Sequence, residues 1–159
     1  MITTTKVQAI DCRHFLNGKF VELKKGKSFE NINPATEEVI GLVAEGGKEE
    51  VEVAVAAARK ALDGPWKTFT LEERSKILRK IGELILERQD ELARLEALDT
   101  GKPVSLANSV DIPRAAYNFH FFADYIISVG TDAYQQNEEA LHYAIRRPVG
   151  VVGIIKPWN

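Results

Sequence analysis

Few residues of this 159-residue chain have the types and spacing of a catalytic or metal centre. Cys12 is the only cysteine, which excludes an internal disulfide and a multi-cysteine zinc site. No base or helix N-terminus is identifiable beside this thiol to stabilise a thiolate, so it lacks the surroundings of an activated nucleophile. The histidines His14, His120 and His142 are too widely separated for metal-ligand spacing. We expect them at the surface or at the edge of the core.

Two other polar residues stand at the ends of predicted elements. Asp99 lies at the C-terminal end of a predicted helix, where the negative end of the macrodipole disfavours a carboxylate. This placement favours a compensating cation, and a plain solvated carboxylate is an equal alternative. Asn159 follows an apolar run, and an isolated asparagine there is typical of a turn at a strand end.

Composition and charge exclude several classes of protein. Lys and Arg total 21 and Asp and Glu total 23, a net charge of -2, and no basic run indicates a nucleic-acid-binding surface. No apolar run approaches the roughly 20 residues that span a bilayer, and Met1–Lys6 lacks the apolar core of a signal peptide. We therefore expect a soluble, cytoplasmic αβ protein that binds neither nucleic acid nor membranes.

The N-terminal part of the chain predicts short strands joined by turns. Asn17-Gly18, between two short apolar stretches, is the strongest hairpin signal, because a type I′ turn needs positive φ at both central positions. Two more strands are expected over Ser28–Asn33 and Val39–Ala44, and Pro34 ends the first of them.

From Lys48 onward the spacing of apolar residues becomes helical. Thr70-Leu71-Glu72-Glu73 is a capping box, in which the two end side chains satisfy backbone N–H groups at a helix start. Pro113 removes one backbone hydrogen bond and is expected to kink the last helix. The expected helices run from Lys48 to Gly64, from Thr70 onward, from Gln89 to Gly101 and from Val104 to Val129.

The C-terminal part of the chain returns to strand patterns. Leu141–Arg147 alternates like a strand, and the nearly unbroken apolar run Val149–Ile155 is typical of a strand buried on both faces. Such a strand needs neighbours, and a parallel crossover needs a dozen or more residues. We therefore expect a truncated chain that oligomerises or aggregates through this unpaired strand.

Several segments, taken in order, resemble the aldehyde dehydrogenase superfamily. No single motif would suffice, but the ordered set extends over almost the whole chain and is highly specific. The matching segments are the hairpin Phe15–Phe20, the turn Asn31–Thr36, the helix-ending stretch Leu98–Pro103, and the PVGVVG…PWN pattern of Pro148–Gly153 and Pro157–Asn159.

The resemblance implies an α/β fold of which this chain supplies the N-terminal part. Residues 1–130 would be strands and helices of the cofactor-binding domain, 131–148 oligomerisation strands, and 149–159 the first strand and PWN turn of the dinucleotide-binding sheet. The family's nucleophilic cysteine, its general-base glutamate and its glycine-rich pyrophosphate segment are not in this sequence. Because Cys12 lies in the wrong context to replace that cysteine, we expect the isolated chain to be inactive.

The resemblance also implies roles for the C-terminal residues. The amide of Asn159 would donate to the oxyanion formed when a thiolate attacks an aldehyde, and losing such a donor costs about 10²–10³ in rate. Ile155, Lys156, Pro157 and Trp158 would line the adenosine and nicotinamide-ribose side of NAD or NADP. Lys156 departs from the small or apolar residue that is commoner there, and Trp158 also suits a core position.

A monovalent cation site follows from the same resemblance. In parts of the family, a cation such as potassium is bound by an aspartate that matches Asp99. Backbone carbonyls at positions matching Asn31 and Ile32 complete that site. A hard, oxygen-only shell suits sodium or potassium.

Two stretches, Asp111–Ala123 and Leu141–Pro148, look like the branch that acts on hydroxymuconic and aminomuconic semialdehydes. Betaine-aldehyde and broad-specificity dehydrogenases share much of this pattern. We therefore expect the N-terminal portion of a homo-oligomeric, NAD(P)-dependent enzyme that oxidises a small aldehyde to a carboxylic acid. The alternative is a non-catalytic αβ interaction or oligomerisation module. A reading frame that continues past Asn159 into a family-like cysteine and glutamate would separate the two.

Overall fold

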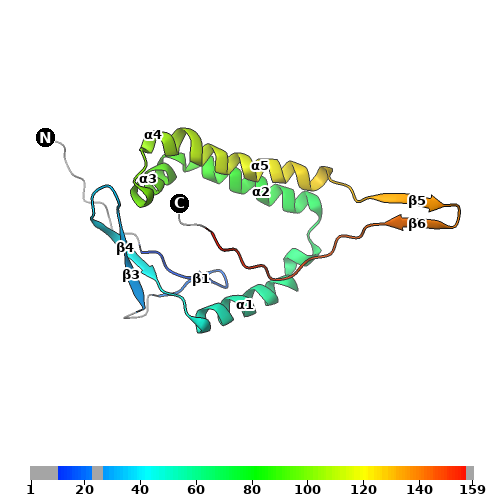
Figure 1. Cartoon of the computed structure of the whole chain (residues 1–159), viewed down its shortest axis with the longest axis horizontal. Coiled ribbons are helices and arrows are strands. Elements are labelled where there is room, and N and C mark those ends of the chain that lie inside the picture. Colours follow the sequence, from blue (N-terminus) through cyan, green and yellow to red (C-terminus); the bar gives the residue numbers. More distant parts are fainter. Residues whose placement is uncertain (1–10, 23–26, 157–159) are drawn as a thin grey trace.

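A computed structural model describes residues 11–22 and 27–156 of the chain. Three antiparallel strand pairs and a group of helices follow one another along the sequence (Figure 1). The strands are β1 (Phe15–Leu16), β2 (Lys19–Phe20), β3 (Ser28–Ile32), β4 (Val39–Ala44), β5 (Ala133–Asn137) and β6 (Ala140–Tyr143). The helices are α1 (Lys48–Leu62), the 3₁₀ turn η1 (Pro65–Thr68), α2 (Leu71–Glu87), α3 (Gln89–Thr100), α4 (Val104–Leu106), the π-helical turn η2 (Ala107–Asp111) and α5 (Ile112–Ser128).

The predicted N-terminal hairpin is confirmed. Asn17 and Gly18 have φ values of +51° and +77°, the positive pair that the turn requires. The turn places Phe15 opposite Phe20, with ring centroids 5.1 Å apart. Local turn chemistry therefore sets the register of β1 and β2.

β3 and β4 form the second antiparallel pair, and its register shifts between Asn31 and Ile32. The segment around Cys12 joins β4 through a parallel bridge to Val43. In this bridge the Cys12 N–H donates to the Leu42 carbonyl at 2.7 Å. Residues 11 and 12 are thereby held beside the β3–β4 pair.

The predicted start of α2 and end of α3 are confirmed in detail. The Thr70 side chain accepts from the Glu73 N–H at 3.2 Å, and Glu73 accepts from the Thr70 N–H at 2.8 Å. Gly101 ends α3 in the left-handed conformation, with φ +75°.

The irregularity expected at Pro113 lies one turn earlier, in η2. Pro113 itself lies in the first turn of α5, directly after η2, so the backbone hydrogen bond that its missing N–H removes would have ended within η2. The chain therefore continues from α4 into α5 through a π-helical turn.

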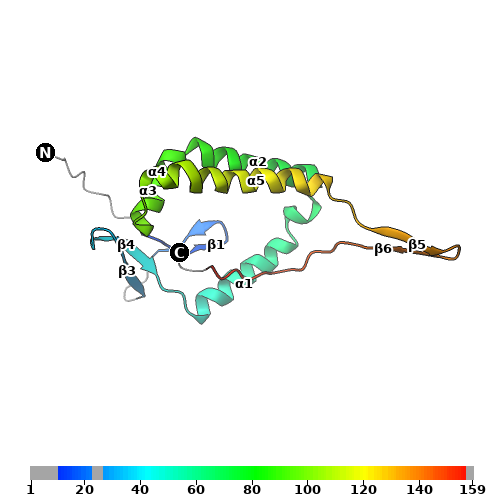
Figure 2. The same cartoon turned by 45° about the horizontal axis from the view of Figure 1, so that its top comes forward.

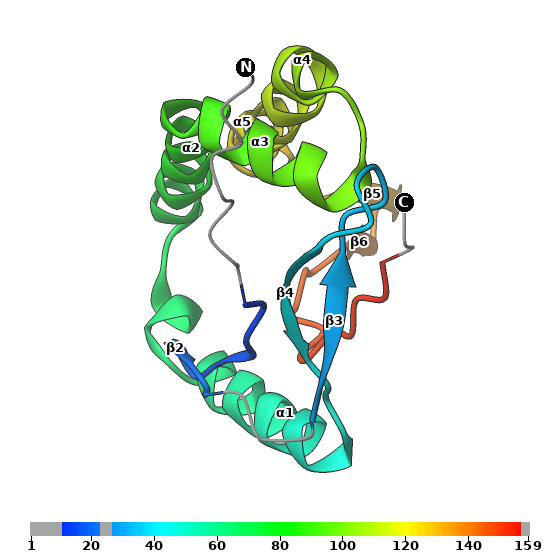
Figure 3. The same ribbon diagram turned by 90° about the vertical axis from the view of Figure 1, so that its left-hand side faces the viewer.

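α2 and α5 lie side by side and form the main packed unit (Figures 1 and 2). Small side chains occupy the most buried helical positions, which lets the helix backbones approach closely. Those with at most 1% of their surface exposed are Ala93, Ala107, Ala116 and Ala123. α1 lies on the opposite side of the molecule from α3 and α4 (Figure 3).

β5 and β6 form a hairpin that projects beyond the end of α5 (Figures 1 and 2). The strand expected over Leu141–Arg147 ends at Tyr143. The strand expected over Val149–Ile155 does not form, and Val149 is 93% exposed. A strand requires a hydrogen-bonded neighbour, and the described residues provide none for this segment.

Candidate functional site

The predicted cation residues Asn31 and Asp99 meet where β3 approaches the end of α3. The Asn31 side-chain amide donates from Nδ2 to Asp99 Oδ1 at 2.6 Å. Nearby, a Cβ on Gly101 would lie 2.9 Å from Cγ of Pro34, so only glycine fits this contact without adjustment. The two contacts join the β3–β4 pair to the helices.

A cavity of about 350 Å³ lies at this junction. Its walls are mostly apolar, and its polar groups come from both sides of the junction. The lining residues are Cys12, Asn31, Ile40, Leu92, Leu95, Glu96, Leu98, Asp99 and Ile112. The third predicted residue, Ile32, does not line it and is 50% exposed at the register shift of β3.

Asn31 reaches Asp99 through its side-chain amide, whereas the resemblance implied a role for its backbone carbonyl. Within residues 11–22 and 27–156, no group of three His, Cys, Asp or Glu side chains has metal-binding geometry. A cation at Asp99 would therefore need backbone or amide oxygens to complete its shell. Asn31 presents its amide N–H rather than its oxygen to Asp99, so its side chain would have to turn to join such a shell.

Lys102 forms ion pairs with two carboxylates on the helical side of this junction. Its Nζ lies 2.8 Å from Glu96 Oε1 and 2.9 Å from Asp111 Oδ2. The hydrogen bond to Glu96 raises the pKa of the Lys102 ammonium, and the bond to Asp111 adds to this effect. Sequence reasoning missed this ion network, although the TGKP stretch places Lys102 only three residues after Asp99.

The π-helical turn η2 is held against α3 at its other end by amides. Gln89 Nε2 donates to both the backbone O and Oδ1 of Asn108, each at 2.9 Å. Asn108 Nδ2 in turn donates to Asp90 Oδ1 at 2.7 Å. These bonds hold the start of η2 against the start of α3, and Lys102 joins Asp111 at the end of η2 to Glu96 of α3.

Of the predicted cofactor residues, the structure describes Ile155 and Lys156, and neither lines the cavity at this junction. Ile155 is 99% exposed and Lys156 is exposed, so the backbone of both is accessible to a ligand. Pro157, Trp158 and Asn159 lie outside the described residues. Cys12 has a free, exposed thiol, and its backbone forms the β-bridge to Val43 of β4. The sequence identified no catalytic base beside this thiol.

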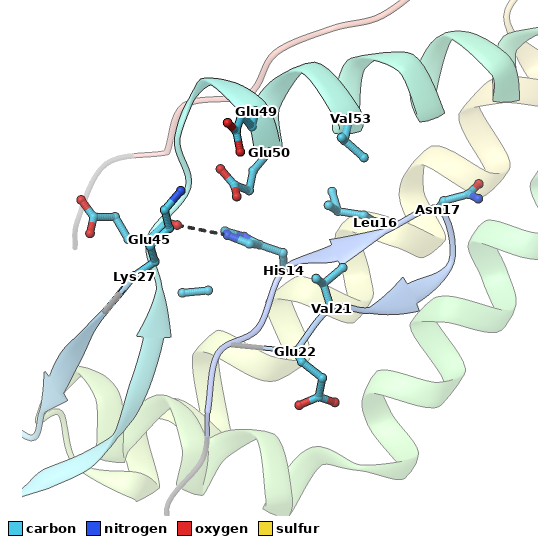
Figure 4. A pocket seen from close by; sticks show the side chains of 11 residues that line it. His14, Leu16, Asn17, Val21, Glu22, Lys27, Glu45, Glu49, Glu50 and Val53 are labelled. Carbon is cyan, nitrogen blue, oxygen red and sulfur yellow. Dashed lines mark hydrogen bonds between the residues drawn. The ribbon is translucent and has the colours of Figure 1, made fainter. Parts of the chain in front are cut away.

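A second cavity, of about 370 Å³, lies between the β1–β2 hairpin, the end of β4 and the start of α1 (Figure 4). His14 Nε2 lies 3.4 Å from the Glu45 carbonyl oxygen at its edge. Its acids include Glu22, which pairs with Arg13 at 3.2 Å, and Glu50, which accepts from the Gly47 N–H at 2.9 Å. These bonds give Glu22 and Glu50 a structural role, and none of the predicted site residues that the structure describes lines this cavity.

No helix within the described part of the chain combines the length and apolar character needed to cross a bilayer.

Comparison with known proteins gives a consistent family. The family model described as "Aldehyde dehydrogenase family" matches residues 20–159. The chain is 48% identical over 153 residues to the 2-hydroxymuconic semialdehyde dehydrogenase of Pseudomonas sp. strain CF600, covering 94% of this chain and 32% of that protein. It is 41% identical to the 2-aminomuconic semialdehyde dehydrogenase of Bos taurus, over 92% of this chain and 30% of that protein.

Solved structures agree with the sequence comparisons. The NAD⁺ complex of an aldehyde dehydrogenase from Bacillus cereus superposes with a TM-score of 0.79 and 38% identity, covering 84% of this chain and 28% of that one. The apo form of an indole-3-acetaldehyde dehydrogenase gives 0.81 at 28% identity, covering 92% of this chain and 33% of that one. The chain thus spans about a third of the length of the relatives it matches.

Proposed function

Because this chain belongs to the aldehyde dehydrogenase family, we propose that it is the N-terminal portion of an NAD(P)-dependent enzyme that oxidises a muconic-type semialdehyde to a carboxylic acid. The family match over residues 20–159 is the principal support. The semialdehyde assignment rests on the names of two relatives, at 48% and 41% identity. NAD is the favoured cofactor because a relative of 38% identity has been solved with NAD⁺.

In this proposal the C-terminal residues serve the cofactor and the reacting carbonyl. Ile155, Lys156, Pro157 and Trp158 would border the cofactor, and a bound nicotinamide would supply the hydride acceptor. The high exposure of Ile155 and Lys156 fits this role, since their backbone groups are open to a ligand. The neutral amide of Asn159 would donate a hydrogen bond to the oxyanion that develops on the aldehyde oxygen.

Asp99 would bind a monovalent cation such as potassium or sodium. The junction supplies a carboxylate oxygen from Asp99 and an amide from Asn31, whose side chain can turn its oxygen toward a cation. The backbone carbonyls of Asn31 and Ile32 lie on the adjoining strand β3 and would complete an oxygen-only shell. A cation there would join β3 to the negative end of the α3 dipole.

The β5–β6 hairpin would pair with another subunit. Its apolar side chains are largely exposed, at 63% for Tyr134, 65% for Leu141 and 67% for Tyr143. An exposed strand pair with apolar side chains is a template for association with a second chain. This surface also supports the second candidate function, a non-catalytic interaction or oligomerisation module.

The two candidates differ in activity. We expect the 159-residue chain alone to reduce neither NAD⁺ nor NADP⁺ with an aldehyde, because the family's cysteine nucleophile and glutamate base are not in its sequence. The test is absorbance at 340 nm with a semialdehyde, for this chain and for a version extended to the length of its relatives. Activity in the extended version that falls about 10²–10³-fold in Asn159→Ala supports the dehydrogenase. An extended version that associates but never turns over would favour the interaction module.

A further inference from the structure

The tip of the β1–β2 hairpin is formed by Asn17 and Gly18, and both residues are exposed. Figure 4 shows Asn17 at this tip, with its side chain extending away from His14. Neither the Asn17 side chain nor the Gly18 N–H has a hydrogen-bond partner within residues 11–22 and 27–156. A Cβ built on Gly18 meets no atom within 4 Å. In the described part of the chain, the amide and the backbone nitrogen that follows it are therefore both open to reaction.

These two groups have complementary reactivity. The carbon of the Asn17 amide is electrophilic, and the backbone nitrogen of Gly18 can attack it to close a five-membered succinimide ring. The bond between Gly18 N and Asn17 Cγ forms, the Cγ–Nδ2 bond breaks, and Nδ2 leaves as ammonia with the proton of the Gly18 N–H. Water then opens the imide at one of its two carbonyls and leaves residue 17 as aspartate or isoaspartate. A side chain after the asparagine would obstruct the attack, and glycine has none.

The hairpin restrains this reaction only weakly. Ring closure requires the Asn17 backbone to leave the turn conformation, so the reaction proceeds through transient opening of the hairpin. Each strand has two residues, and a hairpin of this size is marginally stable on its own. Its cross-strand pair, Phe15 and Phe20, is 61% and 62% exposed, so little buried apolar surface holds the turn closed.

Asn108 provides a contrasting asparagine within the same chain. It lies in the π-helical turn η2, and its amide is engaged on both sides. Its Oδ1 accepts from Gln89 at 2.9 Å, and its Nδ2 donates to Asp90 at 2.7 Å. The residue that follows, Ser109, carries a side chain. Helical backbone, amide hydrogen bonds and a following side chain all oppose ring closure there.

We propose that Asn17–Gly18 is a site of spontaneous deamidation, at a rate set by opening of the β1–β2 hairpin. Water is the co-reactant, and ammonia is the leaving group. The isoaspartate product continues the chain through its side-chain carbonyl, which adds one carbon atom to the backbone of the turn. The two-residue type I′ geometry does not accommodate this insertion. The inference is independent of the proposed function, because it needs neither a bound cofactor nor the remainder of a dehydrogenase.

The test follows the mass of residue 17 in the unmodified chain during incubation at pH 8 and 37 °C. Trypsin releases residues 14–19, and deamidation adds about 1 Da to this peptide. The tryptic peptide of residues 95–114 contains Asn108 and is the internal control. We expect residue 17 to convert at least about tenfold faster than Asn108, because opening is easier and no side chain follows it. Equal rates, or no gain above a sample digested before incubation, would overturn the inference.

Three variants separate the chemistry from its control by the fold. Asn17→Gln keeps an amide, but attack by Gly18 would then need a six-membered ring, so the mass gain at residue 17 should disappear. Asn108→Gln is the matched control and should leave that gain unchanged. Phe15→Ala removes the cross-strand ring and should speed the gain, because the hairpin opens more often. A gain that persists in Asn17→Gln, or that Phe15→Ala does not accelerate, would contradict the proposal.

Discussion

Gly82 of α2 lies directly against the imidazole of His120 on α5. A Cβ built on Gly82 would fall 2.4 Å from His120 Nε2 and 2.5 Å from Cδ2, closer than real carbon contacts occur. The buried Nε2 has no hydrogen-bond partner within the described residues. The absence of a side chain at position 82 therefore permits the close approach of the two helices.

Gly82→Ala is expected to lower the free energy of unfolding. Overpacking costs about 1–3 kcal/mol, and the higher helix propensity of alanine returns only about 1 kcal/mol. The imidazole could turn away, but the Ala116 carbonyl oxygen, 3.1 Å from the added Cβ, belongs to the α5 backbone and yields less easily. Urea unfolding followed by circular dichroism measures the change.

A double-mutant cycle with His120→Ala identifies the obstacle. In that background the added methyl group meets no imidazole, so Gly82→Ala should cost less than in the original chain. The same cost in both backgrounds would show that His120 is not what position 82 must accommodate.

Thr70→Ala removes the capping box of α2. It should lower the free energy of unfolding by about 1 kcal/mol, because the Glu73 N–H then loses the side-chain oxygen that accepts from it. Thr68→Ala is a suitable comparison, since the Thr68 hydroxyl donates to the Pro65 carbonyl and caps no α-helix. Equal losses in the two variants would mean that the cap is not the cause.

The ion pair of Arg88 and Glu91 predicts a dependence of stability on acid. The hydrogen bond from Arg88, Nη2 to Oε1 at 2.6 Å, lowers the pKa of the Glu91 carboxyl from 4.5. A carboxyl with a lower pKa in the folded state stabilises that state above its unfolded pKa. It loses this contribution as the pH falls through the folded pKa. Because the pair is exposed, the effect should be small.

Glu91→Gln should therefore melt slightly below the original chain at neutral pH, and the difference should shrink as the pH falls below 4.5 and vanish once the Glu91 carboxyl is protonated in the folded state as well. Melting temperatures of both chains between pH 7 and pH 2 provide the measurement. A difference that stays constant across this range would contradict a role for the Glu91 charge.

Local sequence patterns were sufficient to predict most elements of the fold. The turn at Asn17-Gly18, the capping box at Thr70 and the end of α3 at Gly101 all depend on residues close together in the chain, and all three form as expected. The strand expected over Val149–Ile155 depends instead on neighbouring strands. No pairing partner for it exists among the described residues, so apolar pattern alone was not enough.

The candidate site was predictable only in part, for a similar reason. The proximity of Asn31 and Asp99 follows from the family resemblance and is present in the structure. The network of Lys102 with Glu96 and Asp111 depends on how η2 packs against α3. Pro113 indicated an irregularity in this helix, and the structure places it in the turn directly before the proline, but the sequence alone did not show that this turn would bring Asp111 to Lys102.

The cation proposed at Asp99 predicts that melting depends on which monovalent salt is present. Binding to the folded state alone adds RT ln(1 + [L]/Kd), about 2.7 kcal/mol at one hundred times Kd. Potassium or sodium chloride should therefore stabilise the chain, extended to the length of its relatives, more than tetramethylammonium chloride at equal ionic strength. General screening would act equally in all three salts. Asp99→Ala should abolish the difference by removing the charged ligand, whereas Asp90→Ala, which alters the other end of α3 beside Asn108, should preserve it. Identical melting temperatures of the unmodified protein in the three salts would refute a bound cation at Asp99.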